Sequence, residues 1–181
     1  MIRSLLLSVS FILCFIACGK TTPANEKQQI TEKVNQLYSQ YGKSNEAVYN
    51  KPIANDLFSP ELKKTLEDAI NASKADIEKV KNSDHPDEKP LVFEGALFSS
   101  LYEGYNGYSI KNINLHDKTA EVLVQFEYNM VSPKVLWTDK IYFINIDNTG
   151  WRIDNITFDK KLSNSKDLKS SLTDFTQYSK Q

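Results

Sequence analysis

Cysteine and histidine are scarce in this chain of 181 residues. Its two cysteines, Cys14 and Cys18, lie close together near the N-terminus, so the rest of the sequence contains no thiol. That part of the chain therefore has no disulfide, no cysteine nucleophile and no thiolate metal site. The two histidines, His85 and His116, lie in segments with the composition of turns, and we expect neither a metal ion nor a catalytic histidine.

The chain also lacks the motifs of common enzymes and an excess of charge of one sign. It contains no glycine-rich phosphate loop, serine-nucleophile elbow or paired-histidine metal motif, so we expect no cofactor and assign no catalytic residue. The sequence has 22 Lys and Arg against 23 Asp and Glu, a net charge of −1. A chain so close to neutral has no overall field that attracts nucleic acid, and we expect no nucleic-acid partner.

Only one long apolar run is present, at residues 5–16 (LLLSVSFILCFI), and it follows the single positive charge of Arg3. As a helix this run would extend about 18 Å, well short of the hydrocarbon core of about 30 Å. A transmembrane span is therefore the weaker interpretation, and a cleaved secretion signal is the stronger one.

The run ends in residues 15–18 (Phe-Ile-Ala-Cys), which resemble the lipobox of bacterial lipoproteins. In that motif a small residue precedes the cysteine that accepts the lipid. The family usually has Leu where this chain has Phe15 and Ala or Ser where it has Ile16, and ordinary signal cleavage after Ala17 is the alternative.

The lipobox resemblance implies where in the cell the mature protein is located. Residues 1–17 would be the signal peptide, and Cys18 would carry a multi-chain lipid anchor that holds the protein to a membrane. Gly19 follows the cysteine where inner-membrane lipoproteins have Asp, which implies the periplasmic side of the outer membrane. Residues 18–28 are polar after the cysteine, and we expect them to form a flexible tether of about 17 Å.

Two amphipathic helices are expected after the tether, in a domain of residues 29–160. The first has its apolar side chains on one face and stops at Gly42; these side chains are Ile30, Val34, Leu37, Tyr38 and Tyr41. The second begins with Ser59 as its N-cap and Pro60 at its first position, and runs to about Lys81. Residues 82–90 are rich in proline and charge and predict a loop.

From residue 108 the apolar period changes from 3.6 to 2, which predicts strands at residues 108–115, 119–130, 135–146 and 151–158. In the second of these, alternate residues from Ala120 to Met130 are expected on one face. In the fourth, Trp151 and Ile153 differ in parity from the apolar residues that follow, so we expect a bulge near Asp154. Residues 161–181 predict a short C-terminal helix capped by Ser165.

These elements predict an α+β fold with N-terminal helices packed on a curved four-stranded antiparallel sheet. Residues 37–41 (LYSQY), 58–62 (FSPEL) and 148–153 (NTGWRI) resemble pieces of the uncharacterised bacterial lipoproteins of the domain of unknown function 3828. That family has a nuclear-transport-factor-2-like fold. The resemblance implies a cone-shaped pocket between sheet and helices, and it implies no assigned reaction.

Several acidic residues are candidate catalysts. Glu121, Glu127 and Asp139 are expected on the solvated face of the sheet. Some relatives of the implied fold abstract protons with a pocket carboxylate beside a tyrosine, for which Asp154 with Tyr128 or Tyr142 would be the candidates here. A general base must face the pocket, and the sequence does not show where Asp154 points.

The most unusual local sequence is residues 101–108 (LYEGYNGY), in which three tyrosines alternate with two glycines. Tyrosine gives a large contact area at low entropic cost, so Tyr102, Tyr105 and Tyr108 are candidate binding residues. The alternative is that their rings simply cover the edge of the sheet. The apolar residues 91–101 before them are expected to be partly buried at a pocket mouth.

We therefore expect a lipid-anchored envelope protein that binds a small ligand or a protein partner without catalysis. One alternative is an immunity protein against a secreted toxin, because domains of the implied fold recur among immunity proteins. The other is a pocket enzyme that works by acid–base chemistry.

Overall fold

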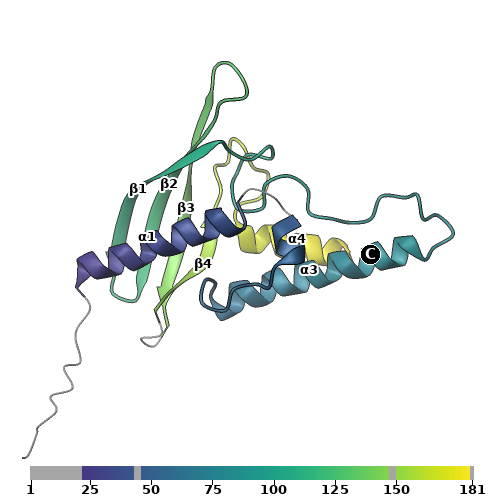
Figure 1. Ribbon diagram of the computed structural model, residues 1–181, viewed down its shortest axis with the longest axis horizontal. Helices are drawn as coiled ribbons and strands as arrows, with labels where there is room; N and C mark the ends of the chain where they lie inside the picture. Colours follow the sequence, from purple (N-terminus) through teal and green to yellow (C-terminus); the bar gives the residue numbers. More distant parts are fainter. Residues whose placement is uncertain (1–21, 43–45, 147–149, 180–181) are drawn as a thin grey trace, which may run out of the picture.

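A computed structural model describes residues 22–42, 46–146 and 150–179. The expected α+β architecture is confirmed, with a four-stranded antiparallel sheet in the order β1-β2-β3-β4 (Figure 1). The leader and Cys18 lie outside the described residues. The elements are α1 (Pro23–Gln40), α2 (Glu46–Asn50), α3 (Pro60–Lys81), β1 (Gly107–His116), β2 (Thr119–Tyr128), β3 (Val135–Asn145), β4 (Trp151–Thr157) and α4 (Leu168–Tyr178).

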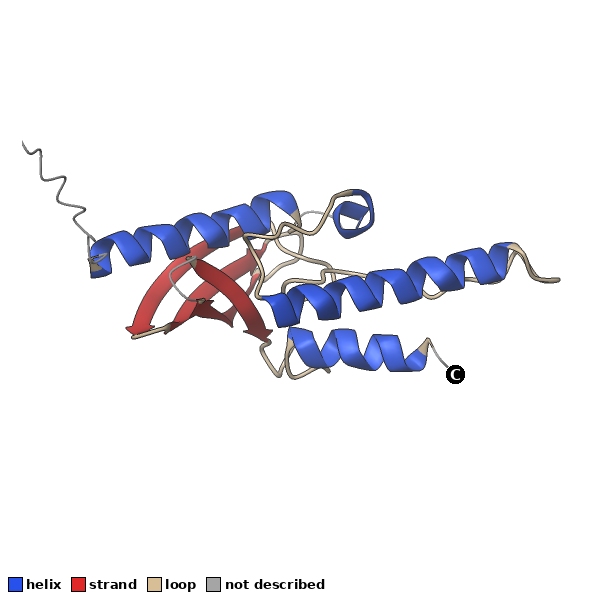
Figure 2. Cartoon of the chain, turned by 90° about the horizontal axis from the view of Figure 1, so that it is seen from below, coloured by secondary structure: helices blue, strands red, loops and turns tan. Residues whose placement is uncertain are grey.

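Helix α1 covers one face of the sheet (Figures 1 and 2) and buries Ile30, Val34, Leu37 and Tyr38 against it. It begins at Pro23, with the hydroxyl of Thr22 accepting a hydrogen bond of 3.4 Å from the backbone N–H of Asn25. Residues 23–28 are therefore helical, and the prediction that the tether reaches residue 28 was wrong. The reason is that Thr22 and Pro23 form an N-cap with proline at the first helical position.

Helix α3 confirms its predicted bounds, since the hydroxyl of Ser59 accepts a hydrogen bond of 3.1 Å from the backbone N–H of Leu62. Helices α3 and α4 lie side by side and extend beyond the sheet (Figure 2). The cap of α4 is Asp167, whose carboxylate accepts from the N–H of Ser170 at 2.9 Å. The predicted cap, Ser165, was wrong because that residue belongs to the preceding turn, where its N–H donates to the hydroxyl of Ser163.

The alternation in β2 is confirmed as far as Phe126, whereas Met130 lies beyond the end of the strand and is 70% exposed. In β4 the register shifts by one residue, because Tyr142 of β3 faces Asn155 while Phe143 faces Ile153. Asp154 is therefore the extra residue of the predicted bulge. The bulge places all four large apolar side chains of this segment in the core, namely Trp151, Ile153, Ile156 and Phe158.

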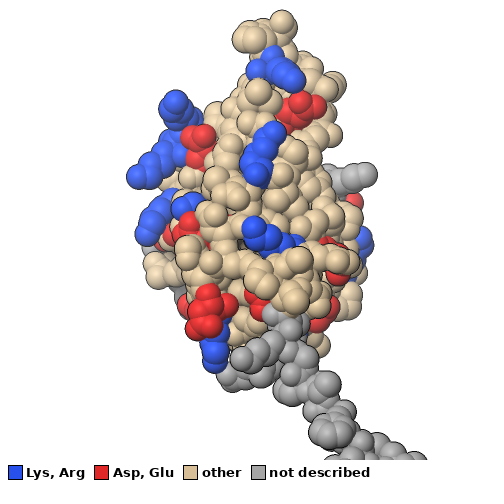
Figure 3. Space-filling model, turned by 90° about the vertical axis from the view of Figure 1, so that its left-hand side faces the viewer, with Lys and Arg blue, Asp and Glu red and all other residues tan. Residues whose placement is uncertain are grey.

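Side chains from α1, α3, α4 and the sheet form one continuous hydrophobic core. On the surface shown in Figure 3, Lys and Arg lie among Asp and Glu, and the described residues form no patch of one sign there. None of the described helices combines the length and apolar character that a membrane crossing requires.

Candidate binding site

Residues 82–106 connect α3 to β1 without a helix or strand, and such long connections are usually functional when they are ordered. Within this segment, residues 95–105 form a closed loop in which the N–H of Ala96 donates to the carbonyl of Tyr102 at 2.8 Å. Gly95 has a φ of +66°, and a β-carbon there would lie 2.6 Å from the carbonyl oxygen of Tyr102. Only glycine can therefore occupy position 95 in the closed loop.

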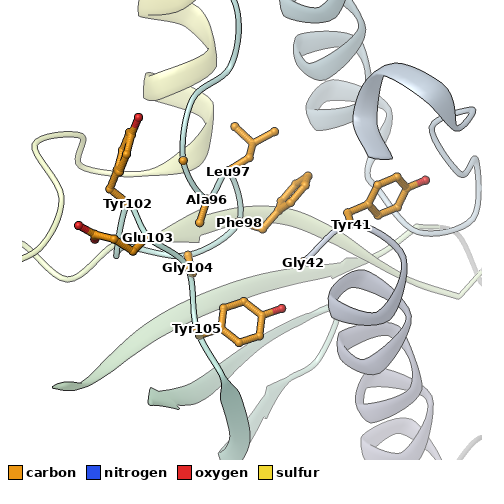
Figure 4. A pocket seen from close by; sticks show the side chains of 11 residues that line it. Tyr41, Gly42, Ala96, Leu97, Phe98, Tyr102, Glu103, Gly104 and Tyr105 are labelled. Carbon is orange, nitrogen blue, oxygen red and sulfur yellow. The ribbon is translucent and has the colours of Figure 1, made fainter. Parts of the chain in front are cut away.

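The loop encloses a cavity of about 130 Å³ against the C-terminal end of α1, which we call the loop cavity (Figure 4). The ring of Tyr105 points from the loop toward Gly42 in this view. A β-carbon on Gly42 would collide with the hydroxyl of Tyr105 and lie 2.7 Å from the carbonyl oxygen of Tyr38. The glycine that was predicted as a helix stop therefore also makes room for Tyr105.

Two of the residues that line the loop cavity have a buried hydroxyl without a hydrogen-bond partner in the described part of the chain. They are the Oγ of Ser99, a residue that is 4% exposed, and the Oη of Tyr105. Burial raises the pKa of Tyr105, and the neighbouring Tyr108 adds to the effect, so this hydroxyl stays protonated. A buried polar group without a hydrogen-bond partner lowers the free energy of unfolding by about 1 to 3 kcal/mol, so the two hydroxyls require a physical explanation.

The three tyrosines proposed as binding residues do not form one surface. Tyr102 is 58% exposed at the cavity wall, and its hydroxyl donates to a carboxylate oxygen of Glu94 at 3.4 Å. Tyr105 points inward, and the hydroxyl of Tyr108 donates to the side-chain oxygen of Asn35 at 2.9 Å. The loop thus presents Tyr102 to solvent, whereas the rings of Tyr105 in the loop and Tyr108 in β1 pack inside the protein.

Tyr105 and Tyr108 belong to an aromatic cluster centred on Tyr38 of α1. The ring centroids of Tyr38 and Tyr105 are 5.7 Å apart at 82°, and those of Tyr38 and Phe126 are 5.3 Å apart at 85°. Such edge-to-face pairs stabilise by about 0.5 to 1.5 kcal/mol beyond the burial of their area. The cluster therefore fixes the base of the loop against α1 and β2.

Asp139 lies on the buried face of β3 and is 0% exposed, so its predicted position on the solvated face was wrong. It shares the parity of Trp137 and Ile141, both of which face the core. Its carboxylate accepts hydrogen bonds from the N–H of Ser100 at 2.9 Å and from the hydroxyl of the same residue. Two further donors are the indole N–H of Trp137 at 3.3 Å and the backbone N–H of Asp159 at 3.2 Å.

The two hydrogen bonds from Ser100 fasten the middle of the 95–105 loop to the sheet. Burial raises the pKa of Asp139, although the bonds from Ser100, Asp159 and Trp137 act in the opposite direction. Because the carboxylate is surrounded by donors from three separate segments, it holds Ser99 and Ser100 in place beside the cavity.

The other candidate acids have structural partners. Asp154 projects from the bulge, where it accepts from the hydroxyl of Ser59 at 2.7 Å and from the ammonium of Lys169 at 3.0 Å. No hydrogen bond of the described residues joins Asp154 to Tyr128 or Tyr142. The bulge therefore directs this carboxylate to the junction of α3, α4 and β4.

Glu121 and Glu127 lie on the outer face of the sheet, in ion pairs of 3.1 Å with Lys140 and 3.2 Å with Lys134. His85 and His116 are exposed. Among residues 22–42, 46–146 and 150–179, no three His, Cys, Asp or Glu side chains come together as metal ligands.

Comparison with known proteins identifies no relative of this chain. No family model, no curated protein sequence and no solved structure matches it. The fold and the cavity therefore define the protein as an α+β domain with a small polar cavity, and its function must be inferred from that geometry.

Proposed function

We propose that this protein is a lipid-anchored binding module of the bacterial cell envelope, and that the loop cavity is its binding site. The anchor rests on the apolar leader and the lipobox-like residues 15–18. The binding role rests on one observation, the unpartnered buried hydroxyls of Ser99 and Tyr105, two residues that line the same cavity.

The size of the cavity limits its occupant. Its volume of about 130 Å³ is well below the roughly 300 to 1,000 Å³ of pockets that hold drug-sized ligands. It accommodates a small polar molecule or one polar side chain of a partner protein. Each hydroxyl can donate and accept a hydrogen bond. An occupant with both a donor and an acceptor group would therefore satisfy Ser99 and Tyr105 together.

A binding role agrees better with the lining than acid–base catalysis does. Glu103 supplies the only carboxylate of the cavity wall in the described chain, and its residue is exposed to solvent. The one fully buried carboxylate nearby, Asp139, accepts four hydrogen bonds, two of which come from Ser100 and hold the loop. Asp154, the candidate base that the sequence suggests, is hydrogen-bonded to Ser59 and Lys169 at the junction of α3, α4 and β4.

The test is affinity purification of the full chain from envelope extract, with wild type, Tyr105→Phe and Tyr178→Phe processed in parallel. Tyr178 is 68% exposed near the C-terminus and away from the loop cavity, so it controls for the loss of a tyrosine hydroxyl. Proteins and small molecules recovered with wild type and Tyr178→Phe should be depleted about tenfold with Tyr105→Phe, as expected for losing one buried hydrogen bond and leaving its partner unpaired. Equal recovery with all three would contradict the proposal.

A further inference from the structure

A second cavity, of about 280 Å³, lies against the same segment of chain. Its walls are residues 92–102, the turn at residues 158–164 and helix α4, and we call it the serine cavity. It shares Ser99 and Tyr102 with the loop cavity. Its volume lies just below the range of about 300 to 1,000 Å³ that is usual for sites of small organic ligands.

Apart from Glu94 and Tyr102, the polar side chains that line the serine cavity carry hydroxyls and one amide. They belong to Ser99, Ser100, Ser163, Asn164 and Ser171. Ser100 is bonded to Asp139, and the Oγ of Ser163 accepts from the N–H of Ser165 at 3.2 Å. Among the residues that the structure places, the Oγ of Ser99 is buried without a hydrogen-bond partner, whereas Asn164 is exposed and Ser171 is half-buried.

The apolar part of the lining is aromatic. The rings of Phe93 and Phe175 are stacked with their centroids 4.4 Å apart and their planes 27° from parallel. Phe158 adds a third phenyl ring to the wall. A ligand with flat apolar C–H faces and hydroxyls around its edge matches such a lining, because the faces pack on the rings while the hydroxyls reach the serines.

The serine cavity offers no unpaired charge to a ligand. Glu94 is the one carboxylate among its described lining residues, and it forms an ion pair with Lys89 and accepts from the hydroxyl of Tyr102. A charged ligand would lose its hydration there without gaining an opposite charge. The lining therefore favours an uncharged ligand.

We propose that the serine cavity binds a small neutral polyhydroxylated molecule of the size of one sugar ring. The site goes beyond the proposed function, because it is a separate cavity and most of its polar residues, Asn164 and Ser171 among them, do not line the loop cavity. Tyr105→Phe tests the loop cavity alone, and Ser171→Ala tests the serine cavity alone, so the two proposals can fail independently.

The experiment titrates the mature full chain in detergent micelles with glucose, glucuronate and glucosamine near pH 6, with amide chemical shifts as the readout. All three probes have the same kind of sugar ring, and they differ in charge. Glucose should shift the amide signals of Ser99, Asn164 and Ser171, and the anionic and cationic probes should bind at least tenfold more weakly because their charges are desolvated. The proposal is overturned if glucose leaves these signals in place or if the charged probes bind equally well.

Two substitutions on α4 provide the matched pair for this titration. Ser171→Ala should weaken glucose binding about fivefold, the effect of losing one hydrogen bond. Ser170→Ala changes the adjacent serine, which does not line the cavity, and should leave the affinity unchanged. Equal affinities of the two variants would also overturn the proposal.

Discussion

The hydroxyl of Tyr105 lies where a β-carbon on Gly42 would be, so the 95–105 loop closes on α1 only with glycine at that position. Gly42→Ala should destabilise the protein by about 1 to 3 kcal/mol, because the backbone of Tyr38 also crowds the added methyl group. The measurement is the urea midpoint at an unchanged m-value.

Gly107→Ala is the control for this substitution. A β-carbon on Gly107 would meet the side chain of Glu127 at 3.4 Å, which is close to an ordinary contact. Its effect on the free energy of unfolding should be small. If both alanine variants unfolded at the same urea concentration, the close fit between Gly42 and Tyr105 would be wrong.

Asp139→Asn should reduce the free energy of unfolding by about 3 kcal/mol, because the new amide N–H₂ would face N–H donors that now bond to the carboxylate. Asp174→Asn, on the exposed face of α4, controls for the loss of a negative charge. Chemical denaturation of both variants measures the difference. Equal stability of the two would show that Asp139 does not fasten the loop.

Asp139 should also make stability depend on pH in a defined direction. Its pKa in the folded protein is raised above the ordinary value that it has in the unfolded chain. Between these two pKa values the folded protein holds a proton that the unfolded chain has lost, so the contribution of Asp139 decreases as the pH rises through this interval. Above the folded-state pKa the contribution is constant.

The measurement for this prediction is the urea midpoint of wild type and Asp139→Asn at a series of pH values from about 3 to 7. The advantage of wild type over the variant should shrink as the pH rises through the interval and then level off. An advantage that grows with pH would mean that the pKa of Asp139 is lowered by folding.

Cys18→Ala should move the protein from the membrane fraction to the soluble fraction, because the proposed lipid is its attachment to the membrane. Cys14→Ala changes the other cysteine of the leader and should leave the protein membrane-bound. Fractionation followed by immunoblotting distinguishes the two. Persistence of Cys18→Ala in the membrane fraction would refute the anchor.

The sequence predicts a structural feature of this fold well where one short segment contains all the residues that specify that feature. Ser59 and Pro60 mark the start of α3 by themselves, and the change of apolar parity after Ile153 can be reconciled only by a bulge. Thr22 and Pro23 form the same signal at the start of α1, but the polar composition of residues 23–28 favours a tether when only the sequence is considered.

The candidate site was harder to predict because its parts come from distant segments. The donors to Asp139 include Ser100 and Asp159, and nothing near residue 139 in the sequence indicates them. Parity with Trp137 does indicate that Asp139 faces inward. Ser99 could not be predicted as a site residue, because one serine in an apolar run is not distinctive.

The most direct test of the binding proposal is the free energy of unfolding of Tyr105→Phe and Ser99→Ala in purified protein without added ligand. Each substitution removes a buried hydroxyl that has no partner in the described chain and keeps most of the packing. We predict that each variant is about 1 kcal/mol more stable than wild type, as expected when a binding site holds polar groups at a cost to stability. A loss of stability in both variants would mean that these hydroxyls are structural, and it would contradict the account.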